Sequence, residues 1–96
     1  MSEAGCRKAL ELQIEGVDLI FGQSLRFGLG FGLPGELVPL PNPNTLFWGG
    51  YGGSLAIIDM DARITFGYAM NSMRPTTTGD TRAMGLIMAA WQALSA

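Results

Sequence analysis

Histidine is absent from this 96-residue sequence, and cysteine occurs only once, at Cys6. A chain without histidine cannot form a Ser-His-Asp triad, cannot activate a cysteine through an imidazole, and lacks the commonest protein ligand of zinc. A single cysteine also cannot form an internal disulfide. We therefore expect Cys6 to be an unreactive, half-buried thiol on a helix, and we expect no metal or cofactor site.

Charged residues are also few, at 15% of the chain, and they sum to a net charge of −2. Because there is no run of lysine or arginine, the composition argues against nucleic acid and anionic membranes as partners. The N-terminal residues lack the apolar core of a signal peptide, and no apolar run reaches the roughly 18 residues of a membrane span. These features predict a cytoplasmic protein, in which Met1 is either the true start or an internal methionine of a longer reading frame.

Hydrophobic residues make up 48% of the chain, which is high beside so few charges. The length suits one domain, and a domain of this size hides only about 60–65% of its unfolded surface. Apolar side chains are therefore expected to remain on the surface, where they need a partner. We expect the chain to self-associate or to pair with another polypeptide segment.

The first half of the chain contains three patterns. Apolar residues recur every four positions over 2–15, which predicts a helix capped by Ser2 and stopped by Gly16. Bulky residues then alternate with arginine or glycine over 25–33, which predicts one strand with a bulky face. Four of the five prolines lie within 34–44, which predicts an exposed loop.

The second half predicts a hairpin followed by a helix. Two antiparallel strands are expected over 51–58 and 63–70, joined by an acidic turn over 59–62. Asp80 is a suitable N-cap for a last helix that runs to Leu94 and is apolar on nearly all sides, so it should be sandwiched against the sheet. The sequence thus predicts an α+β fold with at least three antiparallel strands and a helix at each end.

Three short motifs resemble functional sites but have simpler interpretations. The glycines at 30, 32 and 35 have the spacing of a dinucleotide fingerprint, but prolines follow where a helix must begin. We therefore interpret them as positions where a neighbouring helix or ligand can approach the strand closely. Ser54 lacks the final glycine of a nucleophile elbow and leads into a strand. Asp59 and Asp61 lack the glycine and glutamate of a calcium loop. We therefore interpret Ser54 as a structural strand residue and the two aspartates as turn residues.

The run from Trp48 to Ser54 contains four glycines and is the most distinctive segment of the chain. Glycines entering a strand can leave backbone N–H groups exposed, and such groups can bind a carbonyl oxygen that becomes an oxyanion. The same composition also suits a bend packed under an aromatic pair. Composition alone leaves both interpretations open.

Residues 46–71 resemble the C-terminal segment of the serine β-lactamase-like superfamily, which includes class C β-lactamases, penicillin-recognising peptidases and the family VIII carboxylesterases. In that superfamily a strand beside the nucleophile carries Lys-Thr-Gly or His-Thr-Gly, and the esterases often replace this triplet by Trp-Gly-Gly. The present sequence reads Trp-Gly-Gly at 48–50. Residues 27–33 resemble the preceding strand of these enzymes, and residues 80–94 resemble their C-terminal helix.

The resemblance also implies roles for individual residues. Trp48, Gly49, Gly50 and Tyr51 would bind substrate. The backbone N–H of Tyr51 would form half of the oxyanion hole, and Asn71 would close the second strand of the following hairpin.

Two superfamily motifs are missing. The nucleophile lies in Ser-x-x-Lys, but Lys8 is the only lysine here and Gly5 stands where the serine would be. The second motif has Asn or Ser two residues after a tyrosine, whereas Tyr51 and Tyr68 are followed at that distance by glycine and methionine. We therefore expect 1–96 to be the C-terminal portion of a β-lactamase-related domain, with no catalytic side chain of its own.

By this resemblance the intact protein would hydrolyse small carboxylic esters through a serine acyl-enzyme, and the chain alone would be inactive. The alternative enzyme class is a β-lactamase or penicillin-binding-type peptidase, against which Trp48 argues because a cation there would help to hold the substrate carboxylate. A non-enzymatic module that binds another subunit, or a truncated product that aggregates through a sheet edge, stays open as well. The sequence does not determine the preferred acyl group.

Overall fold

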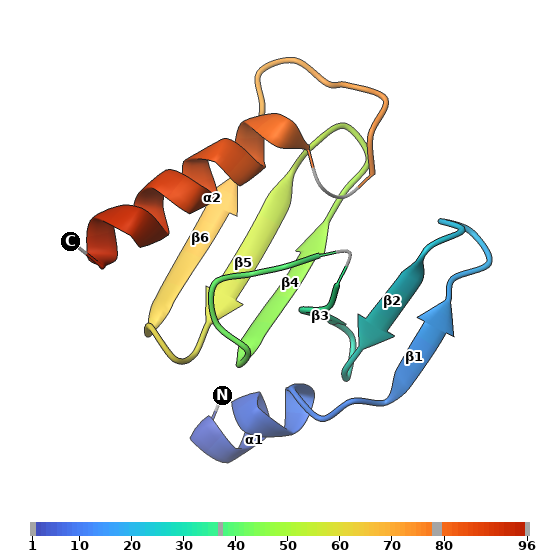
Figure 1. The fold of residues 1–96 in the computed structure, drawn as a ribbon, viewed down its shortest axis with the longest axis vertical. Coiled ribbons are helices and arrows are strands. Elements are labelled where there is room, and N and C mark those ends of the chain that lie inside the picture. The colour runs from blue at the N-terminus through green and yellow to red at the C-terminus, as the bar shows by residue number, and fades with distance from the viewer. Residues whose placement is uncertain (1, 37, 78–79, 96) are drawn as a thin grey trace.

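The computed structural model describes residues 2–36, 38–77 and 80–95, which form one six-stranded antiparallel sheet and two helices (Figure 1). The elements are α1 (Glu3–Ala9), β1 (Ile14–Val17), β2 (Ser24–Phe27), β3 (Gly32–Leu33), β4 (Thr45–Gly49), β5 (Leu55–Asp59), β6 (Ile64–Tyr68) and α2 (Thr81–Leu94). The strands are hydrogen-bonded in sequence order from β1 to β6. This arrangement confirms the predicted α+β class. Neither helix of the described ranges is long and apolar enough to cross a membrane.

Helix α1 begins where the sequence predicts but ends earlier. The Ser2 hydroxyl accepts a hydrogen bond from the Gly5 N–H at 3.1 Å, as an N-cap should. The helix then ends at Ala9, and Gly16 lies inside β1 instead of stopping a helix. The predicted range was wrong because the segment after Ala9 also alternates between apolar and polar residues, and its pairing with β2 supplies the backbone hydrogen bonds.

The single strand predicted over 25–33 is instead a hairpin of β2 and β3. The chain reverses between them, where the Gly28 N–H donates to the Phe31 carbonyl at 2.9 Å and Gly30 has a φ of +79°. Glycine adopts a positive φ without the steric cost that other residues meet, so Gly30 permits the reversal. The alternation of bulky residues continues through this turn, and a period of two therefore did not distinguish one strand from two short ones.

The central hairpin is confirmed with shorter bounds, since β5 and β6 replace the predicted 51–58 and 63–70. Strand β4 pairs with β5 along its whole length. Only the family resemblance predicted this strand, as the one that carries the triplet at 48–50. Residues 34–36 and 38–44 contain no helix or strand, as expected for the proline-rich loop.

Helix α2 packs on one face of the sheet, over β4 to β6 (Figure 1). The core between these two layers consists of Phe47, Leu55, Ile57, Ala83, Ile87 and Trp91. Each large aliphatic side chain buried here stabilises the fold by about 1.5–3 kcal/mol. Asp80 caps the helix as predicted and accepts a hydrogen bond from the Arg82 N–H at 2.8 Å. The helix is not enclosed on all sides, because Leu86, Met88 and Leu94 stay exposed.

The opposite face of the sheet, which we call the open face, is only partly covered. Successive strand residues point to opposite faces, so Leu46 and Trp48 lie on the open face while Phe47 contacts the α2 layer. Helix α1 covers one end of the open face, where Ala9, Leu33 and Leu46 form a second buried cluster. Trp48 lies beyond this cluster and remains 38% exposed.

Candidate active site

The Trp-Gly-Gly triplet spans the end of β4 and the beginning of the glycine turn, Gly50–Gly53, which leads to β5. The Gly50 N–H donates to the Ser54 carbonyl at 3.1 Å and closes the turn. Gly52 and Gly53 have φ values of +109° and +120°, which other residues adopt only with strain. The glycines therefore form a turn, and the expectation that they lead directly into a strand edge was wrong. Ser54 likewise lies just before β5, outside the strand.

Tyr51 lies within the glycine turn, and 65% of its surface is exposed. Within residues 2–36, 38–77 and 80–95, the Tyr51 N–H donates no hydrogen bond to another residue. The N–H groups of Gly50, Gly52 and Gly53, in contrast, each donate a hydrogen bond to a backbone carbonyl. An oxyanion hole requires a backbone donor that is fixed in place and not already paired. The geometry leaves the Tyr51 N–H available for that role, from a turn and not from a strand edge.

Trp48 stands on the open face and is surrounded by aromatic side chains. Its ring centroid lies 5.4 Å from that of Phe27, 6.0 Å from Phe21 and 6.3 Å from Phe47. The Phe21 ring meets the indole edge-on at 73°, and pairs of this kind contribute about 0.5–1.5 kcal/mol beyond their burial. The indole is thus held in one orientation while more than a third of its surface stays accessible. It can form an apolar wall beside the glycine turn.

Small residues lie next to Trp48 on the open face. In the sheet register Trp48 pairs with Ala56, and Ala56 pairs with Gly67. Ala56, Gly67 and the nearby Thr65 are all exposed, and a Cβ added at Gly67 would meet nothing within 4 Å. This strip of the sheet is accessible, and it leaves room for a further layer of protein beside the indole.

The resemblance implied that Asn71 closes the second strand of the hairpin, but the structure places it outside that strand. Strand β6 ends at Tyr68, and Asn71 is exposed in the bend that follows. The backbone beyond it pairs with the glycine turn: the Gly52 N–H donates to the Thr76 carbonyl at 2.8 Å, and the Arg74 N–H donates to the Gly52 carbonyl at 3.1 Å. The prediction of a strand to residue 70 was wrong because Tyr68 pairs with Leu55, the first residue of β5, and β5 offers no partner beyond it.

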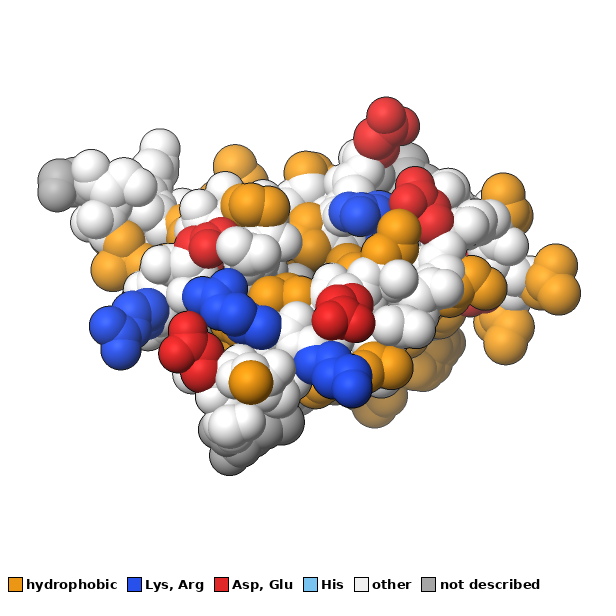
Figure 2. Space-filling model, turned by 90° about the horizontal axis from the view of Figure 1, so that it is seen from below, with side chains coloured by type: hydrophobic (Ala, Val, Ile, Leu, Met, Phe, Trp, Pro, Cys, Tyr) orange, Lys and Arg blue, Asp and Glu red, His pale blue; other side chains and the backbone are white. Residues whose placement is uncertain are grey.

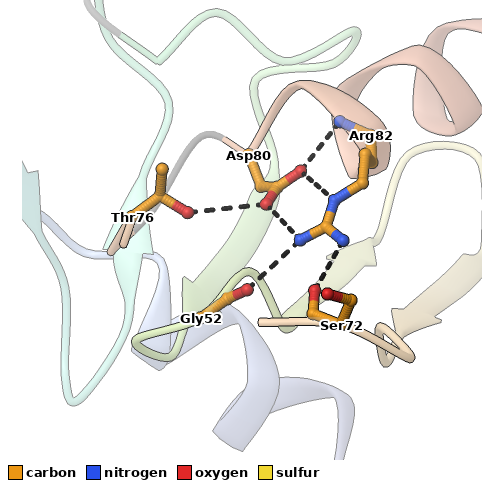
Figure 3. Close-up of polar contacts among 5 residues, drawn as sticks. All are labelled: Gly52, Ser72, Thr76, Asp80 and Arg82. Atoms are coloured by element: carbon orange, nitrogen blue, oxygen red, sulfur yellow. Dashed lines mark hydrogen bonds and ion pairs between the residues drawn. The ribbon is translucent and has the colours of Figure 1, made fainter. Parts of the chain in front are cut away.

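Asp80 has a second role that the sequence analysis missed, as the partner of Arg82 beside the glycine turn (Figure 3). Arg82 Nη2 lies 2.8 Å from Asp80 Oδ2, and Arg82 Nε lies 3.0 Å from Asp80 Oδ1. Hydrogen bonds from the Arg82 side chain hold the pKa of the Asp80 carboxyl well below its usual range, although burial opposes this shift. An arginine two residues after a capping aspartate is the sequence signal that could have indicated the pair.

Asp59 is buried, with 1% of its surface exposed, and is more than the turn residue that the sequence predicted. It accepts hydrogen bonds from Trp91 Nε1 and Asn42 Nδ2 at 2.7 Å each, and from the Ala62 N–H at 2.8 Å. Burial raises the pKa of Asp59, but these hydrogen bonds together lower it below the ordinary value. The carboxylate thus ties α2 and the proline-rich loop to the end of β5. Asp61, in contrast, is an exposed turn residue as predicted.

The dinucleotide spacing at 30, 32 and 35 is followed by loop and not by a helix, so it cannot hold a pyrophosphate at a helix N-terminus. At Gly32 an added Cβ would lie 2.8 Å from the Phe47 ring, so the close neighbour is a side chain of β4 and not the expected helix or ligand. At Gly30 nothing lies within 4 Å of an added Cβ.

Two surface hollows lie away from the glycine turn. One of about 570 Å³ is partly lined by Arg26 and Leu33, and another of about 600 Å³ lies between α1 and the β5–β6 turn. Cys6 borders the second hollow and is half-buried on α1, as expected. Figure 2, viewed from the α1 end, shows acidic and basic side chains interspersed on this face. The described residues contain no group of three or more His, Cys, Asp or Glu side chains that could hold a metal ion.

A solved structure of a penicillin-binding protein homolog from Caulobacter crescentus is similar to this chain, with a TM-score of 0.86 and 29% sequence identity. The match covers 96% of this chain and 25% of the homolog, so this chain spans a quarter of the homolog's length. No protein-family model and no curated protein matches the sequence. The chain therefore has the fold of part of a penicillin-binding-protein-like or β-lactamase-like domain.

Proposed function

We propose that this chain forms the sheet wall of the active site in a serine hydrolase that acts on small carboxylic esters. One observation carries the proposal: at the same end of β4, the Tyr51 N–H is available to donate a hydrogen bond and the indole of Trp48 is exposed. The nucleophile and its base come from polypeptide outside these residues, because the chain contains neither Ser-x-x-Lys nor the tyrosine motif. The chain alone is therefore inactive.

In this mechanism a serine attacks the ester carbonyl, the alcohol leaves, and water then hydrolyses the acyl-enzyme. The carbonyl oxygen carries negative charge in both tetrahedral intermediates, and the Tyr51 N–H donates a hydrogen bond to it. One such donor contributes about 10²–10³ in kcat when it is held rigidly. The backbone hydrogen bonds from Gly50 to Ser54 and from Gly52 to Thr76 support this role because they restrain the turn on both sides of Tyr51.

Trp48 supports an ester over a charged substrate. Lysine or histidine stands at this position in the β-lactamases and peptidases that the sequence resembles, and a cation there binds a substrate carboxylate. The indole of Trp48 carries no charge, and its neighbours Phe21 and Phe27 are apolar as well. An uncharged acyl or alkoxy group fits this surface better than a carboxylate does.

Penicillin recognition is the second candidate, because the similar solved structure is described as a penicillin-binding protein homolog. Nitrocefin and p-nitrophenyl acetate separate the two candidates when they are assayed on the same protein. Faster turnover of nitrocefin would favour the second candidate and would remove the argument from Trp48.

The nucleophile-bearing part is proposed to pack on the open face and on the β1–β2 hairpin. The strip at Ala56 and Gly67 is accessible, and the hairpin region exposes many large apolar residues: Leu12, Ile14, Val17, Leu19, Ile20 and Leu29. Soluble monomers rarely expose contiguous apolar surface without a binding function. A further layer of the same domain would cover this surface and complete the cleft beside Trp48.

The test uses the longest in-frame polypeptide that contains these residues, assayed with p-nitrophenyl acetate. Gly52→Val is expected to reduce activity by about 100-fold, because a β-branched residue adopts the Gly52 φ of +109° only with strain, and relief of this strain would shift the turn next to the donor. Gly85→Val, at an exposed position of α2, is the matched control and should keep activity, since nothing lies within 4 Å of a Cβ there. Unchanged activity in Gly52→Val, or no ester hydrolysis by the parent protein, would refute the proposal.

A further inference from the structure

The guanidinium of Arg82 connects three parts of the chain (Figure 3). Besides its two contacts with the Asp80 carboxylate, its Nη2 donates to the Gly52 carbonyl at 3.3 Å and its Nη1 donates to the Ser72 carbonyl at 2.6 Å. These partners belong to the glycine turn and to the segment after β6. One side chain at the start of α2 therefore contacts the turn from which Tyr51 would donate.

The glycine turn lies directly against this ion pair. A Cβ added at Gly53 would lie 2.5 Å from Asp80 Oδ2 and 3.0 Å from Arg82 Nη2, so no side chain fits between them. Thr76 strengthens the contact, since its hydroxyl donates to Asp80 Oδ2 at 3.4 Å and its carbonyl accepts the Gly52 N–H at 2.8 Å. The N–H of Gly52 is therefore held by Thr76, which contacts the ion pair, and the Gly52 carbonyl is held by Arg82, which belongs to it.

We propose that Asp80 and Arg82 are positioning residues that fix the glycine turn and thereby the Tyr51 N–H, an inference that rests on the proposed function. Tyr51 directly precedes Gly52 in the same short turn, so a shift of the Gly52 backbone is expected to move the Tyr51 N–H as well. The side chains of Asp80 and Arg82 are only 2% and 21% exposed, and solvent therefore screens their interaction less than that of a surface pair.

A purely structural role makes a different prediction, because capping α2 does not require the arginine fork. Lysine at 82 can keep an ion pair with Asp80, but its single ammonium cannot reach the carboxylate, the Gly52 carbonyl and the Ser72 carbonyl in the same geometry. Asparagine at 80 remains a good N-cap. Arg82→Lys and Asp80→Asn thus retain the helix cap while they weaken the contact with the turn.

The first measurement is amide hydrogen exchange by NMR on the 96-residue chain. In Arg82→Lys the N–H groups of Gly52 and Gly53 are expected to exchange at least about tenfold faster, while amides in the middle of α2 keep their rates. Arg7→Lys is the matched control, because the Arg7–Glu3 pair on α1 is exposed and distant from the turn in the fold. Unchanged exchange at both glycines, or equal acceleration in the control, overturns the proposal.

Asp80→Asn provides a second variant if Arg82→Lys does not fold, and the same turn-specific acceleration is expected for it. In the longest in-frame polypeptide, either variant should lower kcat for p-nitrophenyl acetate by about tenfold while KM stays within about twofold. A change confined to KM argues against positioning of the oxyanion donor. If the parent protein hydrolyses no ester, the proposed function fails, and the exchange data still decide whether the pair holds the turn.

Discussion

Asp59 is a buried polar residue whose loss should destabilise this fold strongly. Asp59→Ala removes the acceptor for Trp91 Nε1, which is buried, and for Asn42 Nδ2, which is half-buried. A buried donor left without a partner costs about 1–3 kcal/mol, so we expect the free energy of unfolding to fall by about 3 kcal/mol. Urea denaturation followed by tryptophan fluorescence measures this change. Asp61→Ala, in the exposed part of the same turn, is the control. It removes two hydrogen bonds from Asn44 that are exposed, so that water can replace them, and it should cost only about 1 kcal/mol. Equal losses would contradict the prediction.

The same carboxylate makes stability depend on acid pH. Burial raises the pKa of Asp59, but its hydrogen bonds lower it further, so the folded-state pKa lies below the ordinary 3.8. Such a group stabilises the folded state above the ordinary pKa, and this contribution is lost as the pH falls through the folded-state pKa. We expect the free energy of unfolding to decline from about pH 5 to about pH 2, and to decline less steeply in Asp59→Asn, which cannot ionise. The pKa of Asp80 is lowered as well, so in Asp59→Asn the pH dependence of the free energy of unfolding should become weaker but should not disappear. The same pH dependence in Asp59→Asn and in the parent chain would contradict this account.

The sequence predicts local roles of single residues better than distant ones. Ser2 and Asp80 were identified as helix caps because a cap bonds to backbone only two or three residues away. The burial of Asp59 could not be predicted in this way, since its side-chain partners lie 17 and 32 residues away in the sequence.

The contact between α1 and the β2–β3 turn is the element-scale feature with the least room for change. A Cβ at Gly28 would overlap the Ala9 carbonyl oxygen, which also accepts the Leu29 N–H at 3.3 Å. Backbone atoms cannot move aside as the end of a side chain can, so Gly28→Ala should displace α1 and lower the free energy of unfolding by about 1–3 kcal/mol. Gly16→Ala in β1 has open space and should change it by less than about 0.5 kcal/mol. Thermal unfolding of both variants tests the difference, and equal melting temperatures would contradict it.

Helices and strands that begin or end at a recognisable turn or cap in the sequence were predicted well. Strands whose position depends on pairing with a neighbouring strand were not. The β5–β6 hairpin and α2 follow from an acidic turn and from the Asp80 cap. Ile14 fitted a helical period of four, yet it pairs with Phe27 in the sheet, and only the folded chain brings these two residues together. Gly30 looked like one small residue of an alternating strand, because nothing in that period shows which glycine takes a positive φ.

The residues of the candidate site were proposed from the sequence, but their arrangement could not be predicted from it. The triplet at 48–50 indicated where Trp48 and the Tyr51 N–H would lie. The aromatic support of Trp48 was missed, because Phe21 and Phe27 reach it only after the β1–β2 hairpin folds beside the central strands. The Asp80–Arg82 pair was missed for the same reason, since its contact with Gly52 spans 30 residues of sequence.

The molecule exposes an apolar end, and this should make the isolated chain self-associate. Figure 2 shows apolar side chains gathered at the end that carries β1 and β2, and Leu19 and Ile20 in the turn between these strands are 100% and 90% exposed. Replacing both by serine should reduce association, while the free energy of unfolding stays within about 0.5 kcal/mol because side chains this exposed contribute little to the core. Sedimentation velocity of the parent chain and the double variant measures the effect. A parent chain that stays monomeric at its highest soluble concentration would show that this surface needs no partner, and it would weaken the proposal that a further layer of the domain covers it.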